Sequence, residues 1–378
     1  MSQFLLTEEQ KALMKMCRDF MIKEVIPTSL DDDKAAHFNE TAYKKAVEMG
    51  LHVLGLPEEY GGAGLDEVTF TLLQEQLHWG DAGFANAMGC AQFAYRPVAM
   101  AGTAAQKKKY ADIIVPGGFG CFCLTEANAG SDVAAAKTTA RKVGDEYIIT
   151  GNKHFITTNT LGNFYVVFAY TDKSAGPRGM SAILVDAGAP GVTVGKKEDK
   201  MGIRQSPTGE IIFEEARAPA GNLLGKEGQG FKIAMETLNY ARIDAAASAV
   251  GIAQRALELS IQYAKERVIF GKPIYQHQAM EFLIVDMAMR IEAARSLYLR
   301  AAGEVDAGNM DLKLCSYAKA FASDVAMKVT TDAVQVFGGF GYTREYPVEK
   351  LMRDAKIYQI FEGTNQVQRV VAGKELFK

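Results

Sequence analysis

The residues best suited to catalysis in this sequence are a carboxylate near the C-terminus and a loop of small residues in the middle of the chain. The carboxylate, Glu362, follows the apolar pair Ile360-Phe361 and precedes Gly363. A carboxylate that loses water among apolar neighbours has a raised pKa, which makes it a better base for removing a proton from carbon. A glutamate next to a glycine is, however, more often a solvated turn residue, so the local sequence leaves both interpretations open.

The loop spans residues 124–132, LTEANAGSD, and follows an apolar stretch with strand character. Its backbone N–H groups and hydroxyls could bind a ligand, although an ordinary polar connection is the commoner outcome for a loop considered by itself. Two glycine-rich runs are weaker signals. Helical patterns flank Gly338-Gly339-Phe340-Gly341, which predicts a helix-to-helix turn. No buried strand precedes Gly225-Lys226-Glu227-Gly228-Gln229-Gly230, which predicts a flexible start to a helix, so neither run matches a nucleotide-binding fingerprint.

Composition and charge argue against several other functions. The 378 residues carry a net charge of −3 with Lys and Arg scattered among Asp and Glu, unlike the basic surface of a nucleic-acid-binding protein. The five histidines lie far apart, so we expect no metal site. No apolar stretch approaches the ~18 residues that span a bilayer, and the apolar Phe4–Leu6 lacks the basic region of a leader, so we expect no membrane insertion. Five scattered cysteines favour reduced thiols and a cytoplasmic protein.

Helical periodicity dominates the first third of the chain. Thr7-Glu8-Glu9-Gln10 matches a capping box and is followed by apolar residues at helical spacing. We expect this first helix to end at Pro27 and the acidic run Asp31–Asp33. Further helices are predicted from Asn39 to Met49 and from Asp66 to Trp79.

After Pro116-Gly117-Gly118 the pattern changes to short β-rich runs, which are typical of a compact antiparallel sheet or barrel ending near Gly225. These runs are Cys121–Leu124, Tyr147–Thr150, Phe164–Tyr170, Met180–Val185 and Ile211–Phe213. From Phe231 the chain is helical again, and long amphipathic helices of this kind usually form a bundle. Small residues at helical spacing predict that another helix approaches closely: Ala234, Ala241, Ala245, Ser248 and Ala256.

Several separated motifs, in this order, resemble those of the acyl-CoA dehydrogenase family. They are Pro57 to Gly64, Thr125-Glu126 with Gly130-Ser131-Asp132, Glu266-Arg267 with Phe270 to Pro273, Gln335 to Tyr342, Arg353 to Lys356, and Ile360 to Asn365. The resemblance covers essentially the whole chain and is strongest to bacterial short-chain, butyryl-CoA-like members. It implies an α+β fold with an N-terminal helical domain (1–118), a middle antiparallel β-barrel (119–225) and a C-terminal four-helix bundle (226–378).

The resemblance also implies FAD as the cofactor. Thr125 and Thr157 are similar to hydroxyl groups that hydrogen-bond the flavin ring, and Ser131 to a contact with the pyrophosphate or the acyl-CoA. Phe155 stands where many members carry a tryptophan beside the flavin. The same motifs imply FAD contacts from Cys123, Leu124, Gly130, Ile156, Thr364, Asn365 and Gln366. A further group would reach the FAD of a neighbouring subunit in a homotetramer: Arg267, Phe270, Gln278, Gln335, Gly338 and Gly339.

In such a family member Glu362 would be the base. The implied mechanism is concerted removal of the substrate α-proton by Glu362 with hydride transfer from the β-carbon to flavin N5. The backbone N–H of Glu362 and an FAD ribose hydroxyl would polarise the thioester oxygen, and electrons would pass to electron-transferring flavoprotein. Some members carry the base on an earlier helix, where this chain has Ala241, which cannot accept a proton. Substrate contacts are implied for Ser131, Asn239, Arg242 and Gly363, although Asn239 replaces a commoner acidic residue.

The implied substrate is a short- or medium-chain acyl-CoA. Members that take dicarboxylic acyl groups carry an arginine at the position of Ala85, and an unpaired buried carboxylate would be costly here. Arg96 is predicted at the surface. Two alternatives stay open: the same site working as an enoyl-CoA reductase on a cyclic or aryl-substituted acyl-CoA, and a non-redox family member, which the retained Glu362 disfavours. An acyl-CoA oxidase, usually a longer chain, and a cofactor-free helical interaction protein are the remaining rivals.

Overall fold

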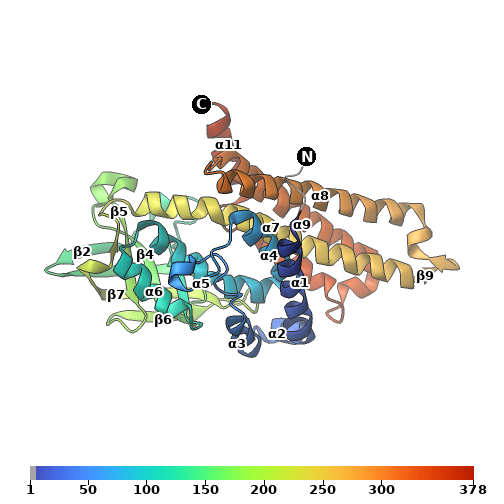
Figure 1. Ribbon diagram of the computed structural model, residues 1–378, viewed down its shortest axis with the longest axis horizontal. Helices are drawn as coiled ribbons and strands as arrows, with labels where there is room; N and C mark the ends of the chain where they lie inside the picture. Colours follow the sequence, from blue (N-terminus) through green and yellow to red (C-terminus); the bar gives the residue numbers. More distant parts are fainter. Residues whose placement is uncertain (1–5) are drawn as a thin grey trace.

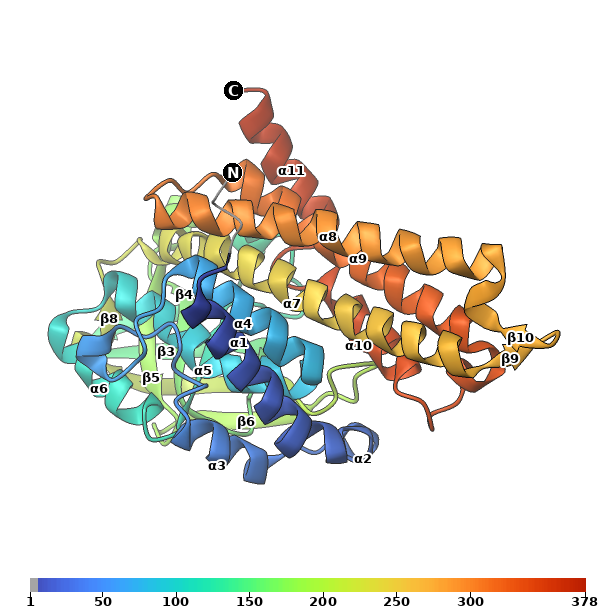
Figure 2. The same cartoon turned by 45° about the vertical axis from the view of Figure 1, so that its right-hand side comes forward.

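The chain folds into helical, β and helical parts that follow one another along the sequence (Figure 1). The computed structural model describes residues 6–378, so most of the apolar run Phe4–Leu6 lies outside the described residues. The order of the three parts and the α+β fold class are confirmed. The N-terminal helices lie against both the sheet and the long helix α7 (Gly230–Glu266), as Figure 2 shows.

The first part begins with the predicted capping box. The Thr7 hydroxyl accepts the Gln10 N–H at 3.1 Å, and the Gln10 side chain accepts the Thr7 N–H at 3.0 Å. The predicted helix end was wrong, because the chain continues through a π-turn into α2, where Asp31–Asp33 lie inside the helix. Acidic residues in a first turn are stabilised by the helix dipole, which explains why they do not end the helix. The helices are α1 (Glu8–Phe20), α2 (Ser29–Ala35), α3 (Glu40–Glu48), α4 (Glu67–Gly80), α5 (Ala82–Ala101) and α6 (Ala104–Ile114).

The β part is a single sheet with the strand order β6-β7-β3-β2-β4-β5-β8, and β1 pairs with β4. The pairs are antiparallel except for β1 with β4 and the short β2–β4 contact, which are parallel. The sheet therefore departs from the predicted antiparallel pattern where β1 arrives from α6 instead of from a hairpin. The strands are β1 (Phe119–Cys123), β2 (Thr139–Val143), β3 (Glu146–Thr157), β4 (Gly162–Tyr170), β5 (Met180–Asp186), β6 (Val192–Lys197), β7 (Thr208–Pro219) and β8 (Leu223–Leu224).

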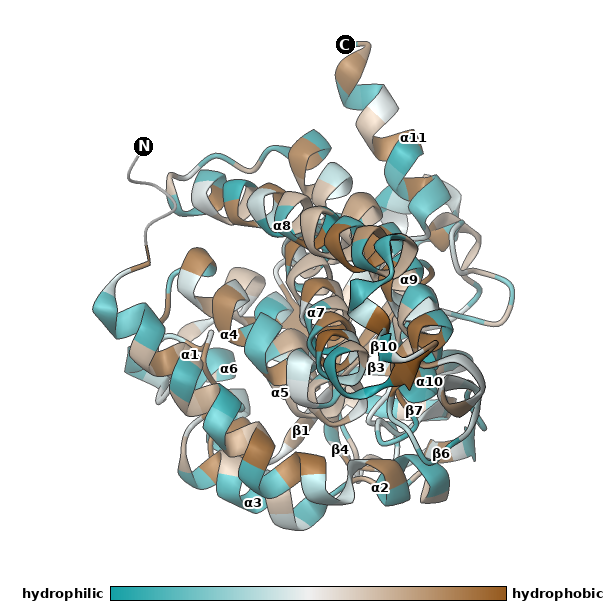
Figure 3. Cartoon of the chain, turned by 90° about the vertical axis from the view of Figure 1, so that its right-hand side faces the viewer, coloured by the Kyte–Doolittle hydropathy of each residue, from teal (hydrophilic) through white to brown (hydrophobic). Residues whose placement is uncertain are grey.

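The C-terminal part is built on α7, which at 37 residues is about 55 Å long. The small residues predicted to form a close-packed face are all buried. Gly251, which was not among them, packs closely on α4: a Cβ there would lie 2.2 Å from the carbonyl oxygen of Glu75. Figure 3 looks along this part, with α7, α8, α9 and α10 seen together. The remaining elements are α8 (Gln278–Asp306), α9 (Leu312–Phe337), α10 (Val348–Tyr358), α11 (Asn365–Leu376) and the small hairpin β9 (Val268–Ile269) and β10 (Lys272–Pro273).

A buried charge cluster ties the first part to the last. Lys350 on α10 lies 2.9 Å from Asp81, which caps α5, and 2.7 Å from Asp354, with each side chain at most 4% exposed. Against the effect of burial, the two carboxylates raise the pKa of Lys350, so it remains a cation. The Asp354 carboxylate also accepts the backbone N–H of Ile203. The cluster thereby fixes α10, the helix that leads into Glu362.

Candidate active site

The loop after β1 is held in place by a buried ion pair. The Glu126 carboxylate accepts the backbone N–H groups of Lys137 at 2.7 Å and Thr138 at 3.0 Å, and the Lys153 ammonium at 2.9 Å. The same ammonium donates to the Leu124 carbonyl at 3.0 Å. Although burial opposes it, the Lys153 charge helps to lower the pKa of Glu126 to about 2. The loop is therefore a rigid feature of the sheet.

This loop meets the end of β3. The backbone N–H of His154 donates to the Thr125 carbonyl at 2.9 Å, which brings Thr125 beside the strand end. The register of β3 against β7 shifts between Lys153 and Ile156, where Phe155 has a φ of 57°. Such a bulge redirects side chains, and here Ile156 is buried while Phe155 is exposed. Phe155 is 62% exposed, and Thr125 and Thr157 are partly exposed. Hydroxyls beside an open aromatic plane suit the polar edge and flat face of a flavin.

The other predicted loop residues differ in what they can offer a ligand. Cys123, Leu124 and Ile156 are buried, so they could contact a cofactor only through backbone atoms. Gly130 and Ser131 are exposed, and a Cβ at Gly130 would meet nothing within 4 Å. This open backbone leaves room for a ligand to approach the loop closely.

Glu362 lies in the turn between α10 and α11, where its φ is 55° and that of Gly363 is 87°. The Gln368 amide donates to the carbonyls of Glu362 at 3.0 Å and Gly363 at 2.9 Å. Burial raises the pKa of Glu362 to about 7, while the nearby cations Lys319 and Arg242 act in the opposite direction. The carboxyl is thus poised near neutral pH, as a base for a carbon acid requires.

Two residues connect this carboxyl with the rest of the site. Arg242 on α7 is buried and donates to the Asn239 side chain at 2.9 Å, so the two predicted substrate residues lie together. Cys90 on α5 accepts the Thr158 hydroxyl at 3.4 Å, next to the predicted Thr157. Burial raises the pKa of Cys90 to about 11, and the Glu362 carboxylate contributes to that rise. Glu362 and the end of β3 therefore share one neighbourhood around Cys90.

The surface prediction for Arg96 was wrong. Its side chain is only 19% exposed and lies 3.6 Å from both Glu67 and Asp244. The guanidinium also stacks over the Tyr240 ring, with 4.5 Å to the ring centre. The sequence did not reveal this because both carboxylates come from other helices, α4 and α7. Ala85 is buried, as expected for a position without a charge partner.

The residues just after Glu362 mostly serve the turn itself. The Thr364 hydroxyl caps α11 by accepting the Val367 N–H at 3.2 Å. Asn365 is 4% exposed, and its amide bonds within the chain through both its oxygen and its nitrogen. Its side chain therefore stabilises the turn, whereas Gln366 is exposed.

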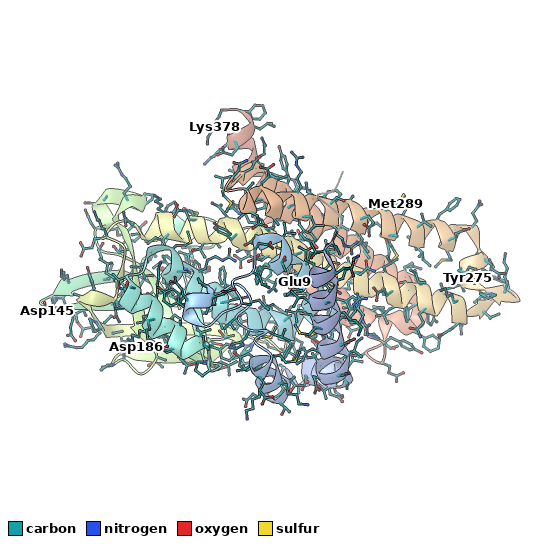
Figure 4. The ribbon with its side chains drawn as sticks, in the orientation of Figure 1. Glu9, Asp145, Asp186, Tyr275, Met289 and Lys378 are labelled. Carbon is teal, nitrogen blue, oxygen red and sulfur yellow. The ribbon has the colours of Figure 1, made fainter. Side chains whose placement is uncertain are left out.

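The residues predicted to reach a neighbouring subunit gather at the far end of the bundle. Four of them line a cavity of about 610 Å³: Arg267, Gln335, Gly338 and Gly339. Phe270 is 91% exposed on the adjacent hairpin, and Gln278 begins α8. Figure 4 shows how distant this end is from the sheet, because Tyr275 and Asp145 mark opposite extremes of the molecule.

Sequence reasoning missed three buried residues of the site: Lys153, Lys319 and Cys90. Lys319 was detectable in principle, since it is a lysine among small apolar residues, Ala318, Ala320 and Ala322, on a buried helix face. Lysine is almost never fully buried unless it is paired. The sequence pattern around Lys319 could not identify its hydrogen-bond partners, because they lie more than forty positions later in the chain.

Comparison with known proteins matches three family models along the chain. They are the acyl-CoA dehydrogenase N-terminal domain at residues 7–117, the middle domain at 121–216 and the C-terminal domain at 228–377. The chain belongs to the acyl-CoA dehydrogenase family. Acyl-CoA dehydrogenases are oxidoreductases, and the family uses FAD.

Several relatives are similar over their full length. The structure of butyryl-CoA dehydrogenase from Megasphaera elsdenii is 44% identical, with a TM-score of 0.96, and covers 99% of this chain and 100% of that one. A chain in a structure described as the electron transferring flavoprotein of Acidaminococcus fermentans is 48% identical, with a TM-score of 0.96, and covers 99% of each. Acryloyl-CoA reductase (NADH) from Anaerotignum propionicum is 43% identical over 99% of this chain and 96% of its own.

Other findings bear on the expected absences. All five cysteines are buried free thiols. Within residues 6–378, no group of three His, Cys, Asp or Glu side chains gathers as a metal site would require. None of the helices in that range has the length and apolar character needed to cross a bilayer.

The ion pair beneath the loop gives a first prediction. We expect Glu126→Gln to weaken FAD binding by roughly tenfold or more, since the change leaves the buried Lys153 without a counter-charge and loosens residues 124–132. The dissociation constant is measured by titrating the apoprotein with FAD and following flavin fluorescence. Glu146→Gln is the matched control. Glu146 lies on β3, the strand that carries Lys153, and pairs with Arg217 at the surface. Equal affinity in both variants would contradict the assigned role of the ion pair.

Proposed function

We propose that this protein dehydrogenates the Cα–Cβ bond of a short- or medium-chain acyl-CoA, giving the 2-enoyl-CoA. The observation that supports this most directly is the carboxyl of Glu362, which is partly buried and whose pKa burial raises to about 7 although Lys319 and Arg242 oppose the rise. FAD, when bound, would accept the hydride from the substrate β-carbon. Glu362 removes the α-proton, and its backbone N–H polarises the thioester oxygen as charge develops there.

The neighbours of Glu362 suit this role. Arg242, buried and near Glu362, favours the ionised base, and its bond to Asn239 orients both side chains at the substrate site. Thr125, Thr157, Phe155 and the open loop at Gly130 and Ser131 would hold the flavin. Of the residues after the base, Gln366 remains a candidate cofactor contact.

The acyl pocket is proposed to favour an uncharged chain. Ala85 offers no cation for a distal carboxylate. Arg96 is already paired with Glu67 and Asp244, so its guanidinium is not free to bind the distal carboxylate of a substrate. Glutaryl-type substrates are therefore disfavoured, and the short-chain relative from Megasphaera elsdenii supports the same choice.

A complete cofactor site requires more than one copy of the chain. Arg267 follows the C-terminal end of α7, and it lines one cavity with Gln335. Large exposed aromatic residues at that end, such as Phe270 at 91% and Tyr342 at 88%, are typical of a subunit interface. We propose a homotetramer in which these residues contact the FAD of a neighbouring subunit.

The proposed electron acceptor is electron-transferring flavoprotein, and the proposed location is the cytoplasm. The similarity to a chain from the Acidaminococcus fermentans structure supports that acceptor. The buried free thiols fit a reducing compartment. The exposed Phe155 lies at the proposed flavin site, on the side where electrons would leave.

A second function, reduction of an enoyl-CoA by the same site, is favoured by one specific observation. A relative 43% identical to this chain is named for reducing acryloyl-CoA. Because both directions pass through one transition state, the residues of the site serve either. The direction is a property of the redox partners and not of Glu362.

The function is tested by anaerobic mixing of the FAD-loaded protein with saturated acyl-CoAs, from short linear to cyclic and aryl-substituted chains. We expect short or medium linear chains to bleach the flavin absorbance fastest, and glutaryl-CoA to bleach it slowest, because no free cation meets its second carboxylate. Rapid bleaching only by a cyclic or aryl-substituted chain would move the substrate to the alternative class. A fully loaded protein that no acyl-CoA bleaches would refute dehydrogenation.

A further inference from the structure

A buried lysine on α9, Lys319, hydrogen-bonds the turn that carries Glu362. Lys319 has no exposed surface, and its ammonium donates to the Gly363 carbonyl at 2.8 Å and to the Asn365 side-chain oxygen at 3.0 Å. These two acceptors flank Thr364 and lie immediately after the base. A buried lysine is costly unless it is paired and hydrogen-bonded, so these bonds account for its position.

Asn365 forms further hydrogen bonds between the turn and α9. Its amide nitrogen donates to Ser323 at 2.9 Å and to Asp324 at 2.8 Å, while its oxygen accepts the Lys319 ammonium. Asp324 in turn accepts the Gln359 amide at 2.7 Å, just before the turn. Residues on both sides of Glu362 are thus held by one face of α9.

The backbone at Glu362 needs such support. Its φ of 55° is in the left-handed region, which residues other than glycine, asparagine and aspartate rarely adopt. Conformations of this kind persist only where the surroundings impose them. Here the imposed conformation directs a carboxylate, so a small relaxation of the turn would move the base relative to its substrate.

The charges around Lys319 and Glu362 come from three helices. Arg242 and Asp244 lie on α7, Lys319 and Asp324 on α9, and the Cys90 thiol on α5. Burial lowers the pKa of Lys319 to about 7, while Glu362 and Asp324 act to raise it. Each member of the Lys319–Glu362 pair therefore stabilises the charged form of the other.

We propose that Lys319 is a positioning residue for proton abstraction: its ammonium fixes the Glu362–Asn365 turn in its left-handed form and supplies a cation that favours the carboxylate of Glu362. This inference rests on the proposed function of Glu362. It assigns to Lys319 no contact with substrate or cofactor. Its effect is on where the base lies and on the pH at which the base is ionised.

The first test uses Lys319→Met, which removes the charge and both hydrogen bonds while keeping an unbranched side chain. The Gly363 carbonyl would retain the Gln368 amide, so we expect the turn to survive but to loosen. With the cation gone, the pKa of Glu362 should rise above its present value of about 7. Isotope-edited infrared spectroscopy measures this directly, through the protonated carboxyl band that is absent from Glu362→Gln.

The second readout is flavin reduction at saturating acyl-CoA. In Lys319→Met the limiting rate should fall roughly 10- to 100-fold, since a slightly misplaced base reacts much more slowly, while the half-saturating acyl-CoA concentration changes little. The pH profile of the limiting rate should shift upward together with the infrared pKa. Lys319→Arg, which restores a cation and donors, should recover part of both losses.

The matched control is Lys328→Met on the same helix, because Lys328 is half-exposed and pairs with Asp332. It should leave both the Glu362 pKa and the limiting rate unchanged. If Lys319→Met does not fold, Lys319→Gln replaces it, keeping a donor but not the charge. An unshifted Glu362 pKa in a folded, uncharged variant would overturn the proposal. If no acyl-CoA reduces even the wild-type flavin, the proposed function fails, and the infrared titration still decides the role of Lys319.

Discussion

Replacing Glu362 by glutamine should slow flavin reduction by acyl-CoA by roughly 10²- to 10⁴-fold, the usual contribution of a general base. The amide keeps the size of the side chain but cannot accept the α-proton. Stopped-flow measurement of flavin bleaching gives the rate, and separate titrations give the affinities for FAD and acyl-CoA. Both affinities should be nearly unchanged, because the carboxyl oxygens of Glu362 are not needed to bind either molecule.

The pH dependence of flavin reduction should differ between the wild type and Glu362→Gln. In the wild type the reduction rate should rise with pH through about 7, since only the ionised carboxylate accepts a proton and burial holds its pKa there. The variant should lose this rise. Glu375→Gln, on the exposed end of α11, is the control and should behave as wild type. Near-normal bleaching by Glu362→Gln would show that another group is the base.

Replacing Lys350 by methionine should produce the largest loss of stability, about 3–5 kcal/mol of the free energy of unfolding. The change leaves the Asp81 and Asp354 carboxylates buried side by side without their cation. Both still hold α5 and the Ile203 backbone in place, so the fold should persist with a much lower denaturation midpoint. Equilibrium denaturation in urea, or thermal unfolding of the FAD-loaded protein, measures the difference.

The control for this prediction lies on the same helix. Lys356 is exposed and bonds only Gln359, so Lys356→Met should change stability by no more than about 0.5 kcal/mol. If Lys350→Met were as stable as this control, the buried cluster would not be what joins α10 to α5.

Local sequence was sufficient for most helices and strands and for the proposal that Glu362 is the base. The capping box at Thr7 and the burial of the small-residue face of α7 both depend on residues a few positions apart, and both are confirmed. Glu362 is a candidate because of its immediate apolar neighbours and its place in a family motif. The helix dipole explains the one failure of this local kind, the acidic run Asp31–Asp33.

The pairing of distant charges was decided only by the tertiary structure. Arg96, Lys153, Lys319 and Lys350 each find their partners on elements that folding brings together, and nothing in their own segments specifies those partners. The same holds for the parallel pairing of β1 with β4.

Motifs and residue patterns were enough to identify the family, to predict the order of the three parts and to propose Glu362 as the base. The surroundings of that carboxylate could be described only from the folded chain. The reason is physical: helical period, capping and motif spacing act over a few residues, whereas burial and electrostatic fields depend on everything within several ångströms in space. Glu362 is specified as a glutamate by its motif, but α5, α7 and α9 together create the environment that raises its pKa towards neutrality.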